Sequence, residues 1–357
     1  MKFLLYFPKT LLPGSRLSAR PGICFSMAAL TALFCPILSA RENDVPEERI
    51  AKMENIVSKL PQIYGFVNMR YQYSDADGSN GFDIRRARID FRGDIVRSFG
   101  YRLQAELAGA PRILDAYFEW KPGSYFNVLA GQQKLPFSLE NPYGPHTLET
   151  VENSQVITAL CGYNDVSGIS ANGRDVGIDF YGGFFKQESH YLIRYTMGIF
   201  SGNGINTTDG NKAKDFSGTL SVNPTGALTL SVFHHNGTSG LQEETHQRIR
   251  SGGGIKYDNG KLLVRSEYIQ GKSGATESEG WYGVLAYFVH PKVQPLLKYD
   301  YFQRDRSLKE TRSIHYLIGV NYSPAKNIRL QMNYVYRTFV GSKNVNYIAI
   351  QLFGLFR

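Results

Sequence analysis

Charged and apolar side chains alternate over residues 85–94, which read RRARIDFRGD. In an extended strand successive side chains point to opposite faces. We therefore expect one charged face and one apolar face. Guanidinium groups bind oxyanions such as phosphate through paired hydrogen bonds, so this charged face could bind anions. The charged set is Arg86, Arg88, Asp90, Arg92 and Asp94, and the apolar set is Ala87, Ile89, Phe91 and Ile95.

An arginine facing lipid at the middle of a membrane barrel costs roughly 2–4 kcal/mol, so three would cost on the order of 10 kcal/mol. The arginines must therefore face water or interior partners. We interpret 85–94 as a wall strand of an outer-membrane barrel, with its apolar face in lipid and its charged face along a water-filled pore. The alternative is a soluble β-protein that packs the apolar rows into one core and leaves the charged rows outside.

The same two-residue period continues to the end of the chain and predicts an all-β fold. The predicted strands are about 8–14 residues long, which suits tilted membrane strands and exceeds the usual globular length of about 5–6 residues. We count about sixteen, near 63–73, 82–95, 99–108, 112–121, 124–132, 174–181, 190–200, 213–222, 227–235, 247–258, 261–270, 280–290, 292–302, 312–322, 327–337 and 344–356.

The connections between these strands alternate in length. Short connections rich in turn residues, such as Asp258-Asn259-Gly260, alternate with longer polar ones, such as 201–212, 236–246 and 271–279. Short turns at one rim and long loops at the other are typical of outer-membrane barrels, and a soluble sandwich lacks this asymmetry. The pattern predicts a transmembrane antiparallel β-barrel of about 16 strands over 62–357.

The first 61 residues have a different pattern. Basic residues precede an apolar run at 23–38, and Ser39 and Ala40 follow it. This is typical of a secretory signal peptide over 1–40, with a membrane anchor helix as the alternative. Apolar residues at helical spacing then predict a short periplasmic amphipathic helix over 41–61, which Pro61 ends.

Charge and cysteine content restrict the function classes. The chain has 40 basic and 31 acidic residues, and the predicted signal removes only basic ones. The small remaining excess does not predict nucleic-acid binding. Only Cys161 lies outside the signal, so no internal disulfide is expected. We find no nucleophile elbow, HExxH motif or phosphate loop, and we interpret His234-His235 as a rim pair. We therefore predict no catalytic residue, metal site or cofactor, and no enzyme.

Three motifs together resemble the phosphate-selective porin O and P family. They are Arg85-Arg86-Ala87-Arg88, the run Gly131-Gln132-Gln133-Lys134-Leu135-Pro136-Phe137-Ser138-Leu139-Glu140, and Gly173-Arg174-Asp175-Val176-Gly177. The resemblance covers roughly 62–357. It implies a sixteen-stranded trimeric porin in the outer membrane of a Gram-negative bacterium, with outer-membrane lipid around it. It also implies a long third loop folded into the lumen and uptake of small anions such as phosphate.

The long connection over 133–172 matches that third loop. A sixteen-stranded barrel leaves an open channel, so a loop folded inward would narrow it. Lys134 stands at its start, and Glu140, Glu149, Glu152 and Asp165 make much of it acidic. In the alternative arrangement the loop lies over the rim and contacts a neighbour or protects the mouth.

Inward-facing bases are the candidate anion pathway. Rings or ladders of such groups replace the hydration shell of an anion and select it. Inward acids, among them Asp90, Asp115, Glu119, Glu267 and Asp300, could instead pair with the bases and leave a general diffusion porin for small polar solutes. A non-transport structural barrel is the third hypothesis. The candidates are Arg70, Arg86, Arg88, Arg92, Arg102, Lys134, Arg194, Arg265, Lys298, Arg329 and Arg337.

Overall fold

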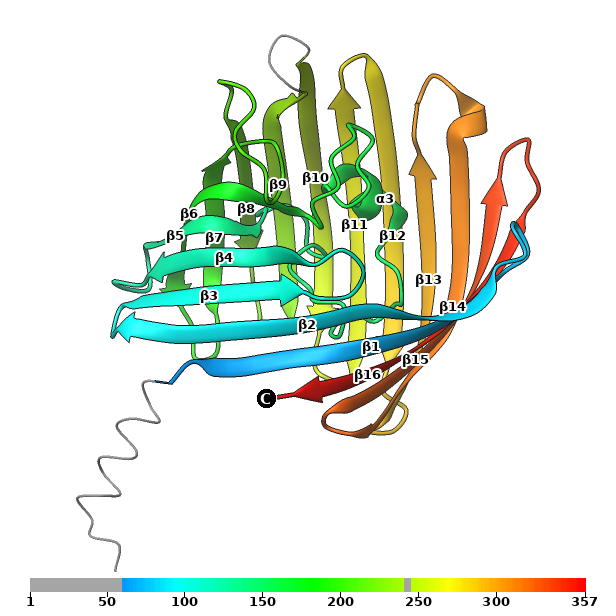
Figure 1. The fold of residues 1–357 in the computed structure, drawn as a ribbon, viewed down its shortest axis with the longest axis horizontal. Coiled ribbons are helices and arrows are strands. Elements are labelled where there is room, and N and C mark those ends of the chain that lie inside the picture. Colours follow the sequence, from blue (N-terminus) through cyan, green and yellow to red (C-terminus); the bar gives the residue numbers. More distant parts are fainter. Residues whose placement is uncertain (1–59, 241–244) are drawn as a thin grey trace, which may run out of the picture. The chain divides into compact units, whose positions relative to one another are not determined.

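A computed structural model describes residues 60–240 and 245–357. The predicted signal peptide over 1–40, and all but the last two residues of the predicted helix over 41–61, lie outside these residues. Within them, strands β1 to β16 form one closed antiparallel barrel (Figure 1). Each strand pairs with the strands next to it in sequence, and β1 closes the barrel against β16. The predicted fold class is confirmed.

The strands lie close to the predicted ranges. Their bounds are β1 Gln62–Ser74, β2 Asn80–Val96, β3 Phe99–Glu106, β4 Arg112–Trp120, β5 Asn127–Lys134, β6 Arg174–Lys186, β7 Tyr191–Phe200, β8 Asp215–Val222, β9 Leu228–Ser239, β10 His246–Asp258, β11 Leu262–Ser273, β12 Thr276–Tyr287, β13 Val293–Gln303, β14 Arg312–Ala325, β15 Ile328–Phe339 and β16 Val345–Phe356. A helix, α3 (Gln155–Leu160), and a single 3-10 turn, η1 (Lys309–Thr311), lie in connections.

Two of the predicted connections are wrong in extent. The polar connection expected over 271–279 is a tight turn, because Ser273 pairs with Thr276 and Gly274 has a φ of 58°, which glycine adopts without strain. Strand β9 likewise runs on to Ser239, so His235 is not at a rim but is buried within the barrel wall. Polar residues continue these strands beyond the apolar part of the wall. The alternation of apolar and polar residues therefore could not show where the strands end.

Side chains alternate between an apolar outer face and a mainly polar inner face. On β15, Met332 and Tyr334 are exposed, while Gln331 and Asn333, which alternate with them, are buried. None of Ile89, Phe91, Leu330 and Met332 belongs to the buried apolar cluster. The soluble alternative required these residues to form a core, so the barrel interpretation holds. Among the described residues, no helix is long and apolar enough to cross a bilayer.

A β-bulge interrupts the alternation in β2. Asn68 of β1 pairs with Arg86, but the next residue, Met69, pairs with Ile84, so Arg85 is the extra residue. Strict alternation would place Arg85 on the face of Ala87, away from the lumen. The bulge instead lets its guanidinium reach Glu152 of the long connection at 2.5 Å. Arg85 is therefore an inward-facing base that the period-two pattern missed.

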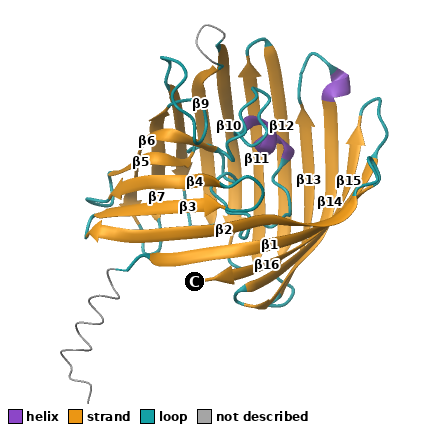
Figure 2. Cartoon of the chain, viewed as in Figure 1, coloured by secondary structure: helices purple, strands orange, loops and turns teal. Residues whose placement is uncertain are grey.

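The connection over 135–173 packs against the inner faces of distant strands. Backbone N–H groups of Leu139 and Gln155 donate to Glu267 of β11 and Asp300 of β13. Helix α3 lies against β11, β12 and β13 (Figure 2). Ser154 precedes the helix in an extended conformation, and Cys161 follows it as a buried free thiol.

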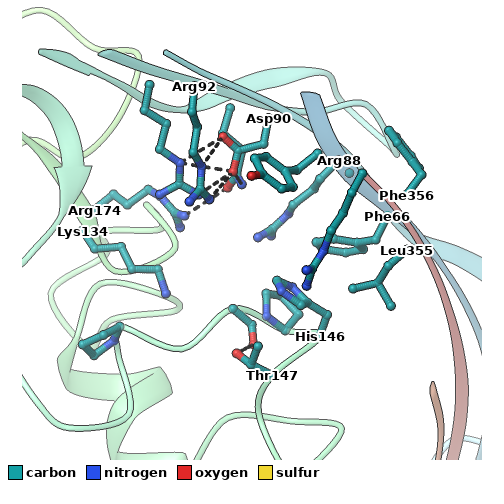
Figure 3. Close-up of a pocket in the computed structure, with 18 residues that line it drawn as sticks. Phe66, Arg88, Asp90, Arg92, Lys134, His146, Thr147, Arg174, Leu355 and Phe356 are labelled. Carbon is teal, nitrogen blue, oxygen red and sulfur yellow. Dashed lines mark hydrogen bonds and ion pairs between the residues drawn. The ribbon is translucent and has the colours of Figure 1, made fainter. Parts of the chain in front are cut away.

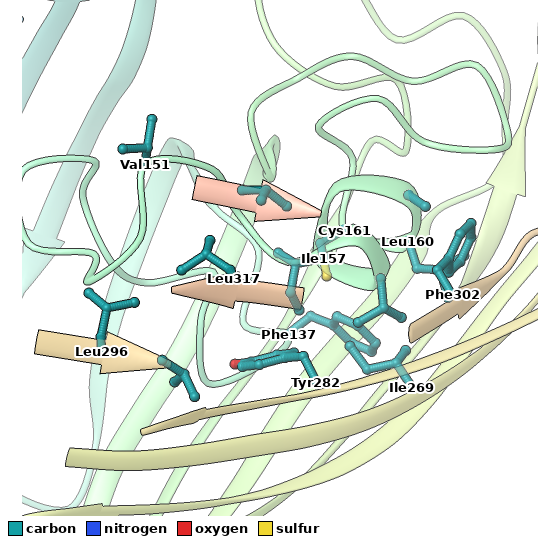
Figure 4. Close-up of a cluster of buried hydrophobic side chains, with 14 of the residues drawn as sticks. Phe137, Val151, Ile157, Leu160, Cys161, Ile269, Tyr282, Leu296, Phe302 and Leu317 are labelled. Atoms are coloured by element: carbon teal, nitrogen blue, oxygen red, sulfur yellow. The ribbon is translucent and has the colours of Figure 1, made fainter. Parts of the chain in front are cut away.

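An apolar cluster forms where α3 meets these strands (Figure 4). Ile157 and Leu160 of the helix pack with inward-facing Ile269, Tyr282 and Phe302. The interior is thus not uniformly wet and cationic, as the sequence pattern suggested. One side of it is a dry contact between the connection and the wall, and this contact places the connection's remaining residues opposite β1, β2 and β3.

Candidate functional site

A pocket of about 520 Å³ lies between the 135–173 connection and the inner faces of β1, β2 and β3 (Figure 3). We call it the basic pocket because six basic residues and one acid line it. Strands β2 and β3 position three of the bases, the two ends of the long connection position two more, and the residue after β16 is the sixth. These residues are Arg88, Arg92, Arg102, Lys134, Arg174 and Arg357, with Asp90 as the acid.

Asp90 is shared by two guanidinium groups. Arg92 and Arg102 each donate to its carboxylate at 2.7 Å, and Gln104 donates at 2.9 Å. Arg92 lies two residues along β2 from Asp90. Arg102 on β3 is directly opposite Arg92 in the strand register. The side chain of Arg92 is 49% exposed, whereas that of Asp90 is 5% exposed. Asp90 therefore orients two guanidinium groups, and that of Arg102 also lies 3.1 Å from the buried carboxylate of Asp115.

Arg88 and Arg174 are more deeply set. Arg88 donates to Glu106 at 2.8 Å, and Arg174 donates to Asp115 at 2.7 Å. Arg174 was absent from the predicted site residues, although it stands in the Gly173-Arg174-Asp175 motif. Its register pairing with Lys134 could have revealed it, since residues directly opposite on neighbouring strands face the same side.

Lys134 binds the long connection rather than an acid. Its Nζ donates to the backbone carbonyls of Asn141 and Tyr143, the latter at 2.7 Å. No carboxylate in the described part of the chain lies within ion-pair distance of it. These two carbonyl groups orient the ammonium, so Lys134 ties the first part of the connection to the pocket.

Candidates on the other strands mainly hold the connection in place. Arg265 donates to Glu149 at 2.7 Å and lies 3.5 Å from Glu140, with its side chain 1% exposed. Lys298 lies 3.2 Å from Asp300 and is equally buried. These two bases are neutralised by acids and are withdrawn from the water-filled space.

Arg70 and Arg86 lie nearer the long-loop rim, on β1 and β2. Arg70 forms ion pairs with Asp83 at 2.7 Å and with Glu152 at 3.4 Å. Arg86 is half-buried, and its Nη1 has no hydrogen-bond partner among the described residues. This nitrogen is itself buried, so this part of the Arg86 guanidinium is not exposed to water in the pore.

Arg194, Arg329 and Arg337 do not line the basic pocket. Arg194 is exposed and lines a second cavity of about 420 Å³, which also contacts Lys134. Arg329 donates to the backbone carbonyl of His146 at 2.6 Å, and the guanidinium of Arg337 lies 4.0 Å from the ring centre of Tyr347. Of the eleven predicted residues, the structure brings four together in the basic pocket, namely Arg88, Arg92, Arg102 and Lys134.

Electrostatics in the connection follow from these contacts. Burial raises the pKa of Glu152, but the nearby Arg85 and Arg86 outweigh burial and leave the pKa below its ordinary value. Burial, followed by the charges of Arg88 and Arg329, lowers the pKa of His146 to about 4. At neutral pH the connection therefore presents an ionised Glu152 and an uncharged His146.

No group of three or more His, Cys, Asp or Glu side chains within 60–240 and 245–357 is arranged to hold a metal ion. His235 lies 3.2 Å from Asp215 and forms an internal pair. His234 is exposed and contacts Ser251 on the neighbouring strand at 2.8 Å. The two histidines thus point to opposite faces of β9, and they cannot share one ligand.

The sequence profile of the phosphate-selective porin O and P family matches residues 62–348. The chain belongs to this family. The family and the fold are those of outer-membrane porins, which are channels. No functionally curated protein matches the chain.

Solved structures of porins share the fold at low sequence identity. An anion-selective porin from Comamonas acidovorans superposes with a TM-score of 0.66 at 14% identity, covering 83% of this chain and 99% of that one. The outer membrane channel DcaP of Acinetobacter baumannii gives 0.60 at 15% identity, covering 83% and 97%. OmpF of Salmonella typhi gives 0.63 at 11% identity, covering 84% and 99%.

Proposed function

We propose that this porin gives passive, anion-preferring diffusion of phosphate or similar anions across the outer membrane of a Gram-negative bacterium. The observation that carries the proposal is the basic pocket, where six bases and one acid line the space beside the long connection. The Comamonas acidovorans neighbour is described as anion-selective, which supports the same direction.

The mechanism rests on replacing water around the anion. A small anion loses part of its hydration shell in a narrow passage, and fixed guanidinium and ammonium donors take the place of that water. Arg92 and Arg102 suit this role because Asp90 orients their planar donors while both remain partly exposed. Lys134 donates to two carbonyl groups of the connection and holds the connection beside these guanidinium groups.

The bases are also arranged along the direction of transport. Arg86, Arg88 and Arg92 lie on the inner face of β2, with Asp90 between the last two, and at ~3.3 Å per residue they span roughly 20 Å of wall. An anion leaving one base would meet the next before it regained its full hydration shell.

The second candidate is a general diffusion porin, favoured by the extent of charge pairing. Arg70, Arg88, Arg265 and Lys298 each contact an acid. In the basic pocket Arg88, Arg92, Arg102 and Arg174 also contact acids, and if this pairing neutralised the pocket, the passage would admit small polar solutes without regard to charge.

We further propose a homotrimer surrounded by outer-membrane lipid. One solved neighbour, OmpT of Vibrio cholerae, is described in a trimer form. In this chain, apolar side chains such as Val67, Met69, Leu103 and Phe118 are exposed on the outer faces of β1 to β4. Such a surface can be covered by lipid or by a neighbouring subunit.

The test is the reversal potential of the purified full-length channel in a planar bilayer under a potassium chloride gradient. We expect a potential of the sign set by chloride, because the basic pocket concentrates anions. A cation-leaning potential would reject the proposal, and a potential near zero would favour general diffusion. A folded, heat-modifiable barrel without conductance would favour a structural role. Competition of phosphate with chloride current then measures phosphate preference.

A further inference from the structure

The basic pocket has an uncharged side as well as a charged one. Phe66, Leu355 and the ring of His146 lie together on that side, away from Asp90 and Lys134 (Figure 3). The ring centres of Phe66 and His146 are 5.0 Å apart. Apolar and aromatic surface therefore faces the same space as the guanidinium groups.

Phe66 is held rigidly in this position. Its ring packs edge-on against Phe353 of the neighbouring strand, with ring centres 5.5 Å apart, and only 5% of the residue is exposed. The guanidinium of Arg88 lies 5.7 Å from the centre of the Phe66 ring. Arg88 thus connects the charged and uncharged sides of the pocket.

The long connection supplies the other ring and keeps it in place. The backbone carbonyl of His146 accepts a hydrogen bond from Arg329 at 2.6 Å, and Pro142 and Pro145 line the pocket beside it. The low pKa of His146, about 4, keeps its ring uncharged at neutral pH. The uncharged side is therefore preformed by two strands and a tethered loop.

An inorganic oxyanion would leave this side of the pocket unused. Guanidinium donors satisfy its oxygens, but apolar surface left in contact with pore water costs free energy. A pocket of about 520 Å³ is also within the range of roughly 300–1,000 Å³ that small organic ligands occupy.

We infer that the basic pocket binds organic anions with an aromatic body, such as aromatic carboxylates, more tightly than small inorganic or aliphatic anions. The carboxylate would lie among Arg92, Arg102 and Lys134, and the ring would pack against the apolar side that Phe66, His146 and Leu355 form together. This inference rests on the proposed function, because it assigns a substrate class to the same anion pathway.

The experiment compares benzoate, acetate, phosphate and benzyl alcohol as blockers of chloride current through the purified full-length channel. Stacking of an added ring contributes about 0.5–1.5 kcal/mol, so we expect benzoate to half-block at a concentration about two- to tenfold below that of acetate. Benzyl alcohol has the ring without the charge and should not block at these concentrations.

Two substitutions test the uncharged side directly. Phe66→Leu removes one ring and His146→Ala removes the other, and the second lies in the connection, so its effect on barrel folding is small. Either change should bring the benzoate and acetate values together, mainly by raising the benzoate concentration needed for half-block. Phe216→Leu is the matched control, because Phe216 is an exposed residue on the outer face of β8.

The outcomes separate this inference from the proposed function. Equal block by benzoate and acetate in an anion-preferring channel would overturn the inference alone. A benzoate preference that survives both Phe66→Leu and His146→Ala would also overturn it. A cation-leaning reversal potential would instead reject the proposed function itself.

Discussion

Two sides of the barrel carry inward-facing bases, and they differ in what those bases contact. On β11 and β13, Arg265 and Lys298 are buried against acids, and the long connection covers them. On β2 and β3, Arg92 and Arg102 share the carboxylate of Asp90, Arg102 also contacts Asp115, and both bases remain partly exposed. Inward-facing bases on β11 and β13 thus hold the connection against the wall, whereas inward-facing bases on β2 and β3 face a water-filled pocket.

The difference shows that an inward direction does not by itself make a base part of an anion pathway. Removing a charge from water is costly unless a partner compensates it, so a base under the connection needs its acid. A base beside water does not need one, and its charge acts on passing ions. Access to water separates the two roles, because Arg92 and Arg102 are partly exposed whereas Arg265 and Lys298 are buried.

The largest expected effect comes from Arg265→Gln, which leaves Glu140 and Glu149 buried without their counter-ion. Loss of one partner of a buried pair costs about 3–5 kcal/mol, so the connection should detach from the wall. We expect protease cleavage within 135–173 in liposome-inserted protein and larger current fluctuations. Arg265→Lys, which keeps the charge, is the control. If the Arg265→Gln channel resisted protease and showed no added current fluctuations, Arg265 would not be needed to hold the connection against the wall.

A smaller and different effect is expected for Arg92→Gln. Its side chain is 49% exposed, so its removal should leave the heat-modifiable migration of the barrel unchanged. One unit charge in watery surroundings contributes about 1 kcal/mol, so the anion-to-cation permeability ratio should fall roughly two- to fivefold. Reversal potentials under a salt gradient measure this ratio.

Lys261→Gln serves as the matched control for Arg92→Gln. Lys261 lies at the short turn between β10 and β11, with its ammonium 5.3 Å from the ring centre of Tyr287. The permeability ratio of this variant should equal that of the original channel. An equal loss of selectivity in both variants would show that general surface charge, rather than the basic pocket, governs ion preference.

The smallest expected effect concerns pH and His146. Its folded pKa of about 4 lies below the ordinary histidine value of roughly 6.5, so the docked connection favours the neutral ring. Docking therefore weakens as pH falls from about 6.5 towards about 4, since only the released ring binds a proton in that window. Below about pH 4 the docked ring gains a positive charge.

We therefore expect the channel and its His146→Gln variant to have equal permeability ratios at pH 7. Only at pH values near or below 4 should the unmodified channel become more anion-preferring than the variant. Reversal potentials of both channels across this range make the comparison. A difference already present at pH 7 would mean that His146 is charged in the docked state.

Much of the fold could be predicted because side chains of a membrane barrel alternate between lipid and lumen, which gives the sequence a two-residue period. Rows such as Met332 and Tyr334 against Gln331 and Asn333 identify the two faces of β15, and turn residues such as Asn259-Gly260 mark the short rim. The period fails where geometry departs from it, as at the bulge of Arg85, and where polar residues extend strands beyond the apolar belt, as in β12.

The candidate site could be predicted only in part from such patterns. The sequence alone determined which residues face inward along the regular parts of the strands, because alternation along a strand is a local property of the chain; the bulge at Arg85 is an exception. Only the tertiary structure decided that Arg265 is paired with two acids of the connection, that Arg174 joins Arg88 and Arg102, and that Phe66 lies beside His146. These contacts join residues far apart in the chain, and their formation depends on how the 135–173 connection packs inside the closed barrel.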